Sequence, residues 1–398
     1  MDINLFIMKE RKKMELKIVN FIKTHSNWEE LLTSSPYNLT IKRDGKLVLF
    51  KYNQINSDFN EDICCEARGL ILEEGTWKVV RMAFKKFFNL GESFATKIDW
   101  DTAVATEKID GSIISVFFYD GKWRIATNST IDAFKAPISG VGPYKNFGEL
   151  FESVLPLSTF AGNRYENICW TFELVSPYNK VVIDYPETKV YLLSVRFMNT
   201  LEEASLDQLS TYAQLIGVDY PQFYYMNDEA GFRKLVEDMP EGHEGIVVRD
   251  AAGQRVKIKT LLYFQMHRAR NNGVITLERA VELILANDYA EFLSYFPEYT
   301  SYFDTVKAII SGIHSIAQTW DEAGLQAKWE ENYSAKVAKK QFAINFANQL
   351  MGGLTPLAFK AYNGGGEKWI NSLNAAQWVK IFAHQFRYVG EDEKQCQT

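Results

Sequence analysis

The chain has 398 residues, of which 46% are hydrophobic and 14% aromatic, enough apolar material for two or three domains with sizeable cores. This composition excludes an intrinsically disordered chain. The 44 basic and 50 acidic residues give a net charge of −6. Any nucleic-acid site must therefore be local, because the chain as a whole is not a cationic coat.

Targeting and redox signals are weak. Residues 1–14 have no continuous apolar core or small-residue cleavage site, and no apolar stretch long enough for a membrane span follows. The cysteines lack CxxC spacing and histidines at metal-ligand spacing, which argues against structural zinc and a disulfide framework. They are Cys64, Cys65, Cys169 and Cys396. We expect a cytoplasmic protein that binds no membrane and has no obligate protein partner.

The predicted elements begin with a helix, since apolar residues recur at helical intervals over 16–32. From Leu39 onward the pattern changes to β-rich runs. Two hairpins are predicted around Asp-Gly turns, and four more strands follow, the last two pairing with each other. The predicted strands are 39–43, 46–52, 113–119, 122–127, 168–175, 189–196, 245–250 and 255–260.

Helical periods lie between the later strands and after them. Ser205 can cap the first of these helices through its hydroxyl. Because only helical periods follow residue 265, the predicted fold class is α+β, with an antiparallel-sheet domain over 1–265 and an all-α domain over 266–398. The predicted helices are 205–217, 228–239, 276–287, 303–320 and 334–350.

The sharpest local feature is Glu107-Lys108-Ile109-Asp110-Gly111-Ser112, directly before a strand. A lysine before an Asp-Gly turn can also be a solvated hairpin end. Further residues of the sheet region weigh against that alternative, because they supply the charges and aromatic rings that a nucleotide site needs. They are Arg68-Gly69, Lys85-Lys86-Phe87-Phe88-Asn89, Glu173, Glu244-Gly245, Lys257 and Lys259.

Lysine is a nucleophile only when neutral, and about one molecule in 2,500 is neutral at pH 7 for an ordinary lysine. Nearby cations would favour the neutral form of Lys108. Lys257 and Lys259 lie on one face of their strand, where a shared polyphosphate would relieve their repulsion. A solvated face would relieve it too.

Two acidic residues complete the set. Glu173 and Glu244 could serve the hydration shell of Mg²⁺, which prefers few carboxylates together with phosphate oxygens. Alternation places Glu173 opposite Phe172 and Leu174, so a half-exposed sheet could also carry it without any function.

The order Lys-x-Asp-Gly, a glutamate in an apolar strand, Glu-Gly and Lys-x-Lys is that of covalent nucleotidyltransferases, namely polynucleotide ligases and mRNA capping enzymes. Within them the chain resembles the phage RNA ligase 1 family over about residues 40–263. Ser112 followed by aliphatic residues matches that family, as do Ala67-Arg68-Gly69 and Lys86-Phe87-Phe88-Asn89-Leu90. The resemblance implies an adenylyltransferase domain followed by a helical domain that positions RNA.

The resemblance also implies roles. Lys108 resembles the nucleophile that carries AMP, and Glu107 precedes it. Arg68, Lys86 and Phe88 resemble nucleotide-contacting residues, and Gly111 allows the close turn. Glu173 resembles the carboxylate for ribose or metal, and Glu244, followed by Gly245, the metal-linked one. Lys257 and Lys259 resemble the pair that holds the α-phosphate and the leaving pyrophosphate, and Val247 is a candidate floor under adenine.

These implications predict an ATP-dependent RNA ligase that uses Mg²⁺, or Mn²⁺ in its place, on RNA ends such as those of a broken tRNA loop. Ile113 stands where DNA ligases and capping enzymes usually have arginine, which argues against both. A catalytically dead RNA- or nucleotide-binding protein would typically have lost the nucleophile or an acid. One departure from the family is Asn128, in place of a basic residue. The segment 266–271 offers a weaker RNA contact.

Overall fold

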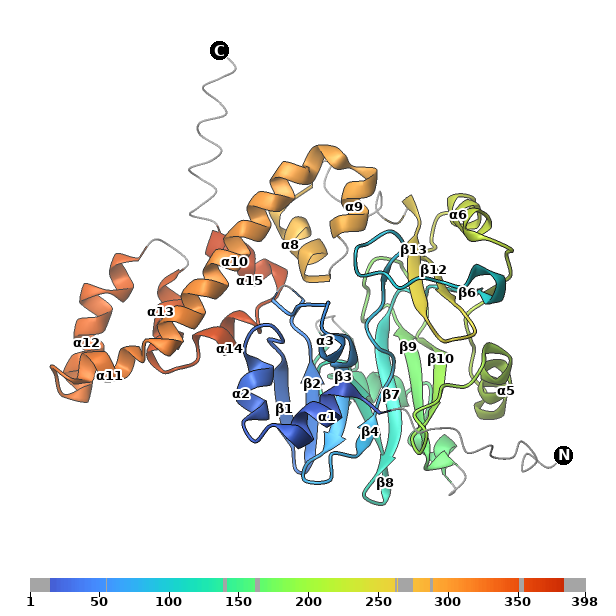
Figure 1. The fold of residues 1–398 in the computed structure, drawn as a ribbon, viewed down its shortest axis with the longest axis horizontal. Coiled ribbons are helices and arrows are strands. Elements are labelled where there is room, and N and C mark those ends of the chain that lie inside the picture. Colours follow the sequence, from blue (N-terminus) through green and yellow to red (C-terminus); the bar gives the residue numbers. More distant parts are fainter. Residues whose placement is uncertain are drawn as a thin grey trace, which may run out of the picture. The chain divides into compact units, whose positions relative to one another are not determined.

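The computed structural model describes residues 15–54, 56–138, 142–161, 165–261, 263, 275–286, 289–350 and 354–382. The chain divides into two compact units, Met1–His267 and Arg268–Thr398. The first unit contains three sheets and the second is helical (Figure 1), so the α+β prediction is confirmed. No helix in the described ranges is long and apolar enough to cross a membrane. The segment 266–271 lies outside these ranges.

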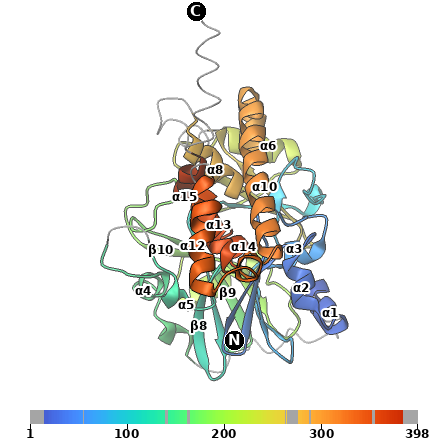
Figure 2. The same cartoon turned by 90° about the vertical axis from the view of Figure 1, so that its left-hand side faces the viewer.

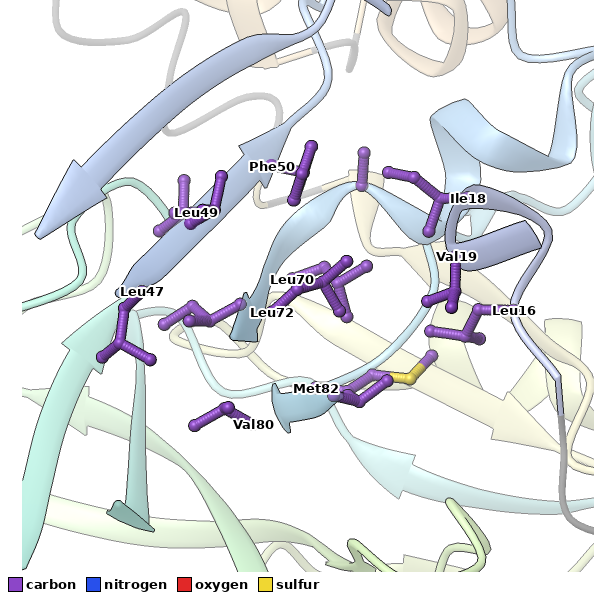
Figure 3. Packing of buried hydrophobic residues seen from close by; sticks show 14 of the residues in the cluster. Leu16, Ile18, Val19, Leu47, Leu49, Phe50, Leu70, Leu72, Val80 and Met82 are labelled. Carbon is purple, nitrogen blue, oxygen red and sulfur yellow. The ribbon is translucent and has the colours of Figure 1, made fainter. Parts of the chain in front are cut away.

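The first sheet is an antiparallel meander in the order β1-β2-β3-β4. Its strand β2 is almost wholly buried, because LVLFK packs against helices at the start of the chain. Figure 3 shows Leu47, Leu49 and Phe50 of β2 in this core, together with Leu16 and Ile18. The elements are α1 (Lys17–Thr24), α2 (Trp28–Thr33), β1 (Thr40–Asp44), β2 (Leu47–Lys51), α3 (Asp62–Glu66), β3 (Arg68–Glu73) and β4 (Val79–Arg81).

The second sheet has the order β10-β9-β7-β8 and is also antiparallel. All eight residues of β9 are buried, so this strand has no solvent face. Its core includes residues of α4 and α5. The elements are β7 (Ser112–Tyr119), β8 (Lys122–Thr127), α4 (Phe147–Glu152), β9 (Ile168–Val175), β10 (Lys189–Phe197) and α5 (Leu206–Ile216), with 3-10 turns at Ala133–Lys135 and Leu157–Phe160.

The third sheet has the order β11-β6-β12-β13-β5. β12 and β13 pair antiparallel, with Gly245 opposite Lys259 and Val247 opposite Lys257. Strand β5 joins β13 in parallel, with Phe88 beside Val256. The elements are β5 (Phe88–Asn89), β6 (Val104–Glu107), β11 (Phe223–Tyr224), α6 (Glu229–Glu237), β12 (Gly245–Arg249) and β13 (Arg255–Lys259), with a 3-10 turn at Trp100–Thr102.

The helical unit has its own apolar cluster, in which Phe342 and Tyr362 are buried. Within it α10 packs against α13 and α14 (Figure 2). The helices are α8 (Leu277–Ala286), α9 (Tyr289–Tyr295), α10 (Thr300–Glu322), α11 (Leu325–Glu330), α12 (Ala335–Asn345), α13 (Leu354–Tyr362), α14 (Gly366–Ile370) and α15 (Ala375–Phe382), with 3-10 turns at Pro297–Tyr299 and Ala347–Gln349.

All eight predicted strands are present within one residue of their predicted ends. Ser205 caps α5 in a reciprocal capping box with Gln208, as its position predicted. The prediction of helix before any strand is confirmed over 16–32, where the extended His25 divides the helical region into α1 and α2. The helix predicted over 334–350 ends at Asn345, because Phe346 leaves the helical conformation.

Candidate active site

Lys108 lies in the link between β6 and β7, where its backbone N–H donates to the carbonyl of Gly245. Its Nζ donates to Oε2 of Glu244 at 2.6 Å, and the other oxygen, Oε1, lies 3.1 Å from Nζ of Lys259. Glu244 and Lys259 are each only 2% exposed. One buried carboxylate therefore bridges two lysines that are far apart in sequence.

The pairing of Lys108 with Glu244 differs from what the sequence led us to expect for the charges next to Lys108. Lys259 lies near Lys108 as expected, since both bind Glu244, but the Lys108 ammonium is itself paired with that carboxylate. The Lys108 side chain remains 22% exposed, so a ligand can still reach Nζ. Before Lys108 can attack as a nucleophile, the ion pair must open and the ammonium must lose a proton. Glu244 lies within hydrogen-bond reach to accept that proton.

Glu173 lies beside this pair, in the middle of a strand that is buried on both faces. The alternative in which a half-exposed sheet carries it is therefore wrong. Burial is the main cause that raises its pKa to about 8, and the charges of Lys108 and Arg68 partly oppose the rise. Glu244 and Asp110 raise it further by repulsion. A buried acid among charged groups is the environment in which functional carboxylates occur.

Arg68 approaches the site from the first sheet. Its guanidinium lies over the rings of Phe87 and Phe84, 5.1 and 5.7 Å from their centroids. Its Nη1 is buried and makes no hydrogen bond to the described residues. A buried donor without an acceptor is costly, and an anionic oxygen such as that of a phosphate would satisfy it.

Two glycines have a steric role. A Cβ on Gly111 would lie 2.5 Å from the carbonyl oxygen of Leu174, so this turn can approach β9 only without a side chain. Gly245 has φ +144°, and a Cβ there would lie 2.0 Å from the carbonyl oxygen of Ile258. Both glycines thus let the Lys108 link and the Glu244 segment approach neighbouring backbone.

The remaining predicted residues occupy other parts of the site. Val247 and Lys257 lie on the face of β12 and β13 opposite to the core. Glu107 does not join the Lys108 group, because its carboxylate faces His243 Nε2 at 3.6 Å. The ammonium of Lys86 lies about 5 Å from the centroids of three aromatic rings, those of Tyr52, Phe59 and Phe88.

Two residues were missed as site residues. The carboxylate of Asp110 accepts the backbone N–H groups of Val182 and Ile183, at 2.8 and 2.7 Å. The Tyr263 hydroxyl donates to the same carboxylate at 3.2 Å, and Lys259 Nζ lies 5.0 Å from the Tyr263 ring centroid. The sequence signal was a tyrosine four residues after Lys259, too common a spacing to single out.

The donor set fits a divalent ion held largely by its own waters and substrate phosphates. Among the residues that the structure describes, no three or more histidine, cysteine, aspartate and glutamate side chains are grouped to hold a metal. Glu173 and Glu244 supply two buried carboxylates. Mg²⁺ commonly binds through one or two carboxylates plus phosphate oxygens, so these residues are sufficient for it.

Comparison with known proteins finds a family whose model matches about half of the chain. The model of a family described as RNA ligase matches residues 66–267, the segment that contains Lys108, Glu173, Glu244 and Lys259. The chain therefore belongs to this RNA ligase family.

Three relatives are similar over longer stretches. A protein of Autographa californica nuclear polyhedrosis virus, named as a bifunctional polynucleotide kinase/RNA ligase, is 26% identical over 71% of this chain and 44% of its own length. An RNA ligase of Rhodothermus phage RM378 is 26% identical over 63% of this chain and 70% of its own. RNA ligase 1 of bacteriophage TS2126 is 28% identical over 57% and 58%. For two of these three relatives, the match spans less than two thirds of their length.

Proposed function

We propose that this protein is an ATP-dependent RNA ligase that joins a 5′-phosphate to a 3′-hydroxyl. The observation that carries the proposal is the bridge from Lys108 through Glu244 to Lys259. In this proposal Lys108 is the nucleophile, Glu244 its base and Lys259 a cation for phosphate, and their contacts with one another support these roles. The orphaned Nη1 of Arg68 adds an anion contact on the side of the first sheet.

Three nucleotidyl transfers follow from these groups. In the first, Nζ of Lys108 loses its proton and attacks the α-phosphorus of ATP; a P–N bond forms and the bond to pyrophosphate breaks. In the second, an oxygen of the RNA 5′-phosphate attacks the same phosphorus, and Lys108 recovers its electron pair and a proton. In the third, an RNA 3′-hydroxyl attacks the activated end and AMP leaves.

The site residues divide these tasks. Lys257 and Lys259 stabilise charge on the α-phosphate and on the leaving pyrophosphate. Glu173 and Glu244 would hold Mg²⁺ or Mn²⁺, which supplies charge neutralisation at the phosphates. Val247 would lie under adenine. We assign the positioning of RNA ends, such as those of a broken tRNA loop, to the helical unit, and we place the reaction in the cytoplasm.

The test is incubation of the full chain with Mg²⁺ and α-labelled ATP or GTP, followed by denaturing electrophoresis. Label from ATP should remain on the protein through an acid-labile, alkali-resistant bond, and Lys108→Ala should abolish it. Label retained by Lys108→Ala would refute the nucleophile. Label from GTP would favour a capping enzyme instead, and no label from either nucleotide would favour a protein that only binds RNA.

A second assay separates RNA ligase from DNA ligase. Single-stranded RNA with a 5′-phosphate and a 3′-hydroxyl should be joined or circularised, because a single strand can bend into the site and stack its bases on aromatic rings. Faster sealing of a nicked DNA duplex with equal ends would favour the DNA ligase.

A further inference from the structure

A pocket of about 720 Å³ lies beside the candidate active site, within the sheet unit. Its walls come from the α3 to β5 region and from the β12–β13 turn. This volume is within the range of about 300–1,000 Å³ that is typical of ligand sites. The pocket includes Lys86 and Phe88, but most of its lining has no role in the steps above.

The pocket carries surplus positive charge. Arg196, Arg249 and Arg255 converge on one carboxylate, that of Glu203, whose side chain is 7% exposed. Burial alone would raise the pKa of Glu203, but Arg255, Arg196 and Arg249 lower it to about 2. The lining also contains Lys85, Lys86, Asp62 and Glu202, so its five basic and three acidic side chains leave a net charge of +2. An anionic ligand would relieve the remaining repulsion.

The three arginines differ in how accessible their guanidinium groups are to a ligand. Arg196 is fully engaged, donating to the carbonyls of Ala83 and Leu201 as well as to Glu203. The side chains of Arg249 and Arg255 are 15% and 11% exposed. Arg249 also donates to the carbonyl of Ala204 and Arg255 to that of Gly253. Both are more exposed than Arg196, whose side chain is 6% exposed, so a ligand in the pocket meets these two guanidinium groups first.

An aromatic wall stands beside these cations. Phe94 is 40% exposed, although large apolar side chains are normally covered. Its ring packs on those of Phe59 and Phe88, with centroids 6.1 and 5.5 Å away. A supported, exposed ring next to cations is the combination that binds single-stranded nucleic acid, because bases stack on the ring while phosphates face the cations.

Strand β13 runs between this pocket and the group around Lys108, with Arg255 at one end and Lys259 at the other. Lys259, Lys257 and Arg255 alternate along the strand and so share one face. The core residues Val256 and Ile258 face the other way. At about 3.3 Å per residue, Arg255 lies about 13 Å along the strand from Lys259. We refer to Lys259, Lys257 and Arg255 as the β13 cation row.

The chemistry of the second step indicates which of the two RNA strands binds to the β13 cation row. The attacking and leaving groups lie roughly in line at the transferred phosphorus. Lys108 is the attacking group in the first step and the leaving group in the second. The RNA 5′-phosphate must therefore enter from the side where pyrophosphate left, which is the side that the proposed roles of Lys257 and Lys259 define.

From these observations we infer that the pocket binds the 5′-phosphorylated RNA strand, with a base on Phe94 and backbone phosphates at Arg255 and Arg249. The inference rests on the proposed function, because it names the substrate strand of the same reaction. It predicts that changes at Phe94 and Arg255, which have no proposed role toward ATP, weaken RNA binding in the second step without weakening ATP binding in the first.

The test uses the full chain with Phe94→Ala and, separately, Arg255→Gln. Phe134→Ala is the matched control for the first, since Phe134 is also about 40% exposed but lies outside the pocket. Arg233→Gln is the control for the second, because Arg233 forms an exposed ion pair on α6. The pre-adenylated protein is mixed with a 5′-phosphorylated single-stranded RNA oligonucleotide, and AMP transfer is followed in a single turnover.

The half-saturating RNA concentration should rise about 5- to 150-fold in Phe94→Ala, the range that corresponds to one lost base stack. It should also rise in Arg255→Gln, while half-saturation by ATP in lysine adenylation changes less than twofold. Both controls should match the wild type. Should Arg255→Gln fail to fold, Phe94→Ala still decides the question, because its ring is exposed.

Two results would overturn the inference. In one, the wild type transfers AMP to RNA and both pocket variants keep its half-saturating RNA concentration. In the other, the ATP constant rises as much as the RNA constant, which would assign the pocket to the triphosphate of ATP. Failure of the wild type itself to transfer AMP to RNA would instead count against the proposed function.

Discussion

Replacing Glu173 with glutamine should make the protein more stable at alkaline pH. The carboxyl is buried and its pKa is raised from 4.5 to about 8, mainly by burial. Between these two values the folded protein binds a proton that the unfolded chain does not, so stability falls as pH rises. The whole change corresponds to about 5 kcal/mol at about 1.4 kcal/mol per pH unit. Glutamine keeps the shape of the protonated acid and titrates nowhere in this range.

The assay is urea denaturation of the full chain, without metal or nucleotide, at pH 5 and pH 8. The stability of Glu173→Gln relative to the wild type should increase by about 3–4 kcal/mol between the two conditions. Glu166→Gln is the control, because Glu166 is an exposed residue near the start of the same strand. A difference that stays constant between pH 5 and pH 8 would refute the reasoning, since Glu173 would then ionise freely in the folded protein.

Three further predictions concern the site and the two units. Lys257→Ala and Lys259→Ala should each slow adenylate formation by about 10²–10³-fold, the usual effect of losing charge stabilisation in the transition state. A rapid-quench assay measures the rate of adenylate formation, and unchanged rates would contradict the assignment. Gly245→Ala should destabilise the protein by about 3 kcal/mol or more, because the added Cβ collides with the carbonyl of Ile258. The control is Gly121→Ala, because Gly121 also has positive φ but open space around it. It should lower the free energy of unfolding by only about 1–2 kcal/mol, and thermal melts of both variants measure the difference. A folded fragment ending at residue 265 should still form the lysine adenylate but join structured RNA poorly, and a fragment that cannot form the adenylate would show that the helical unit takes part in the first step.

Much of the fold could be predicted from local pattern alone. Alternation and Asp-Gly turns defined both hairpins, because side-chain direction in a strand depends only on parity. The same pattern could not show that β9 is covered on both faces, since burial of the Glu173 face depends on helices and strands distant in sequence. That is why Glu173 could be interpreted as a harmless surface residue.

The site was predictable as a set of residues but not as a geometry. Lys108, Glu244 and Lys259 could be named from motif order. The bridge between them depends on the pairing of β6, β12 and β13. This pairing brings Glu244 to Lys108 although the two are 136 positions apart in the sequence. The charged residues could therefore be predicted from the sequence. The Lys108–Glu244 ion pair, the proton acceptor and the Tyr263 contact could not.

The departure at Asn128 illustrates the same limit. The resemblance to the phage RNA ligase 1 family implies a basic residue there, and the amide appeared to leave the phosphates short of a cation. In the structure the Asn128 Oδ1 accepts from Nη2 of Arg81 at 2.9 Å, although Arg81 lies 47 positions earlier on β4. Arg81 is completely buried and donates to the side chains of Ser115 and Asn128, neither of them an acid.

A buried guanidinium that donates to Oδ1 fixes the orientation of the carboxamide, because only the oxygen of the amide can accept. The amide NH₂ of Asn128 is then directed away from Arg81 as a donor. Gly69, which adjoins Arg68, keeps this contact tight, since a Cβ there would meet both Arg81 and Asn128. A buried arginine of β4 thus contacts the side chain at position 128, where the resemblance implies a basic residue. A comparison of single positions cannot detect this contact, because Arg81 belongs to the first sheet and Asn128 directly follows β8 of the second.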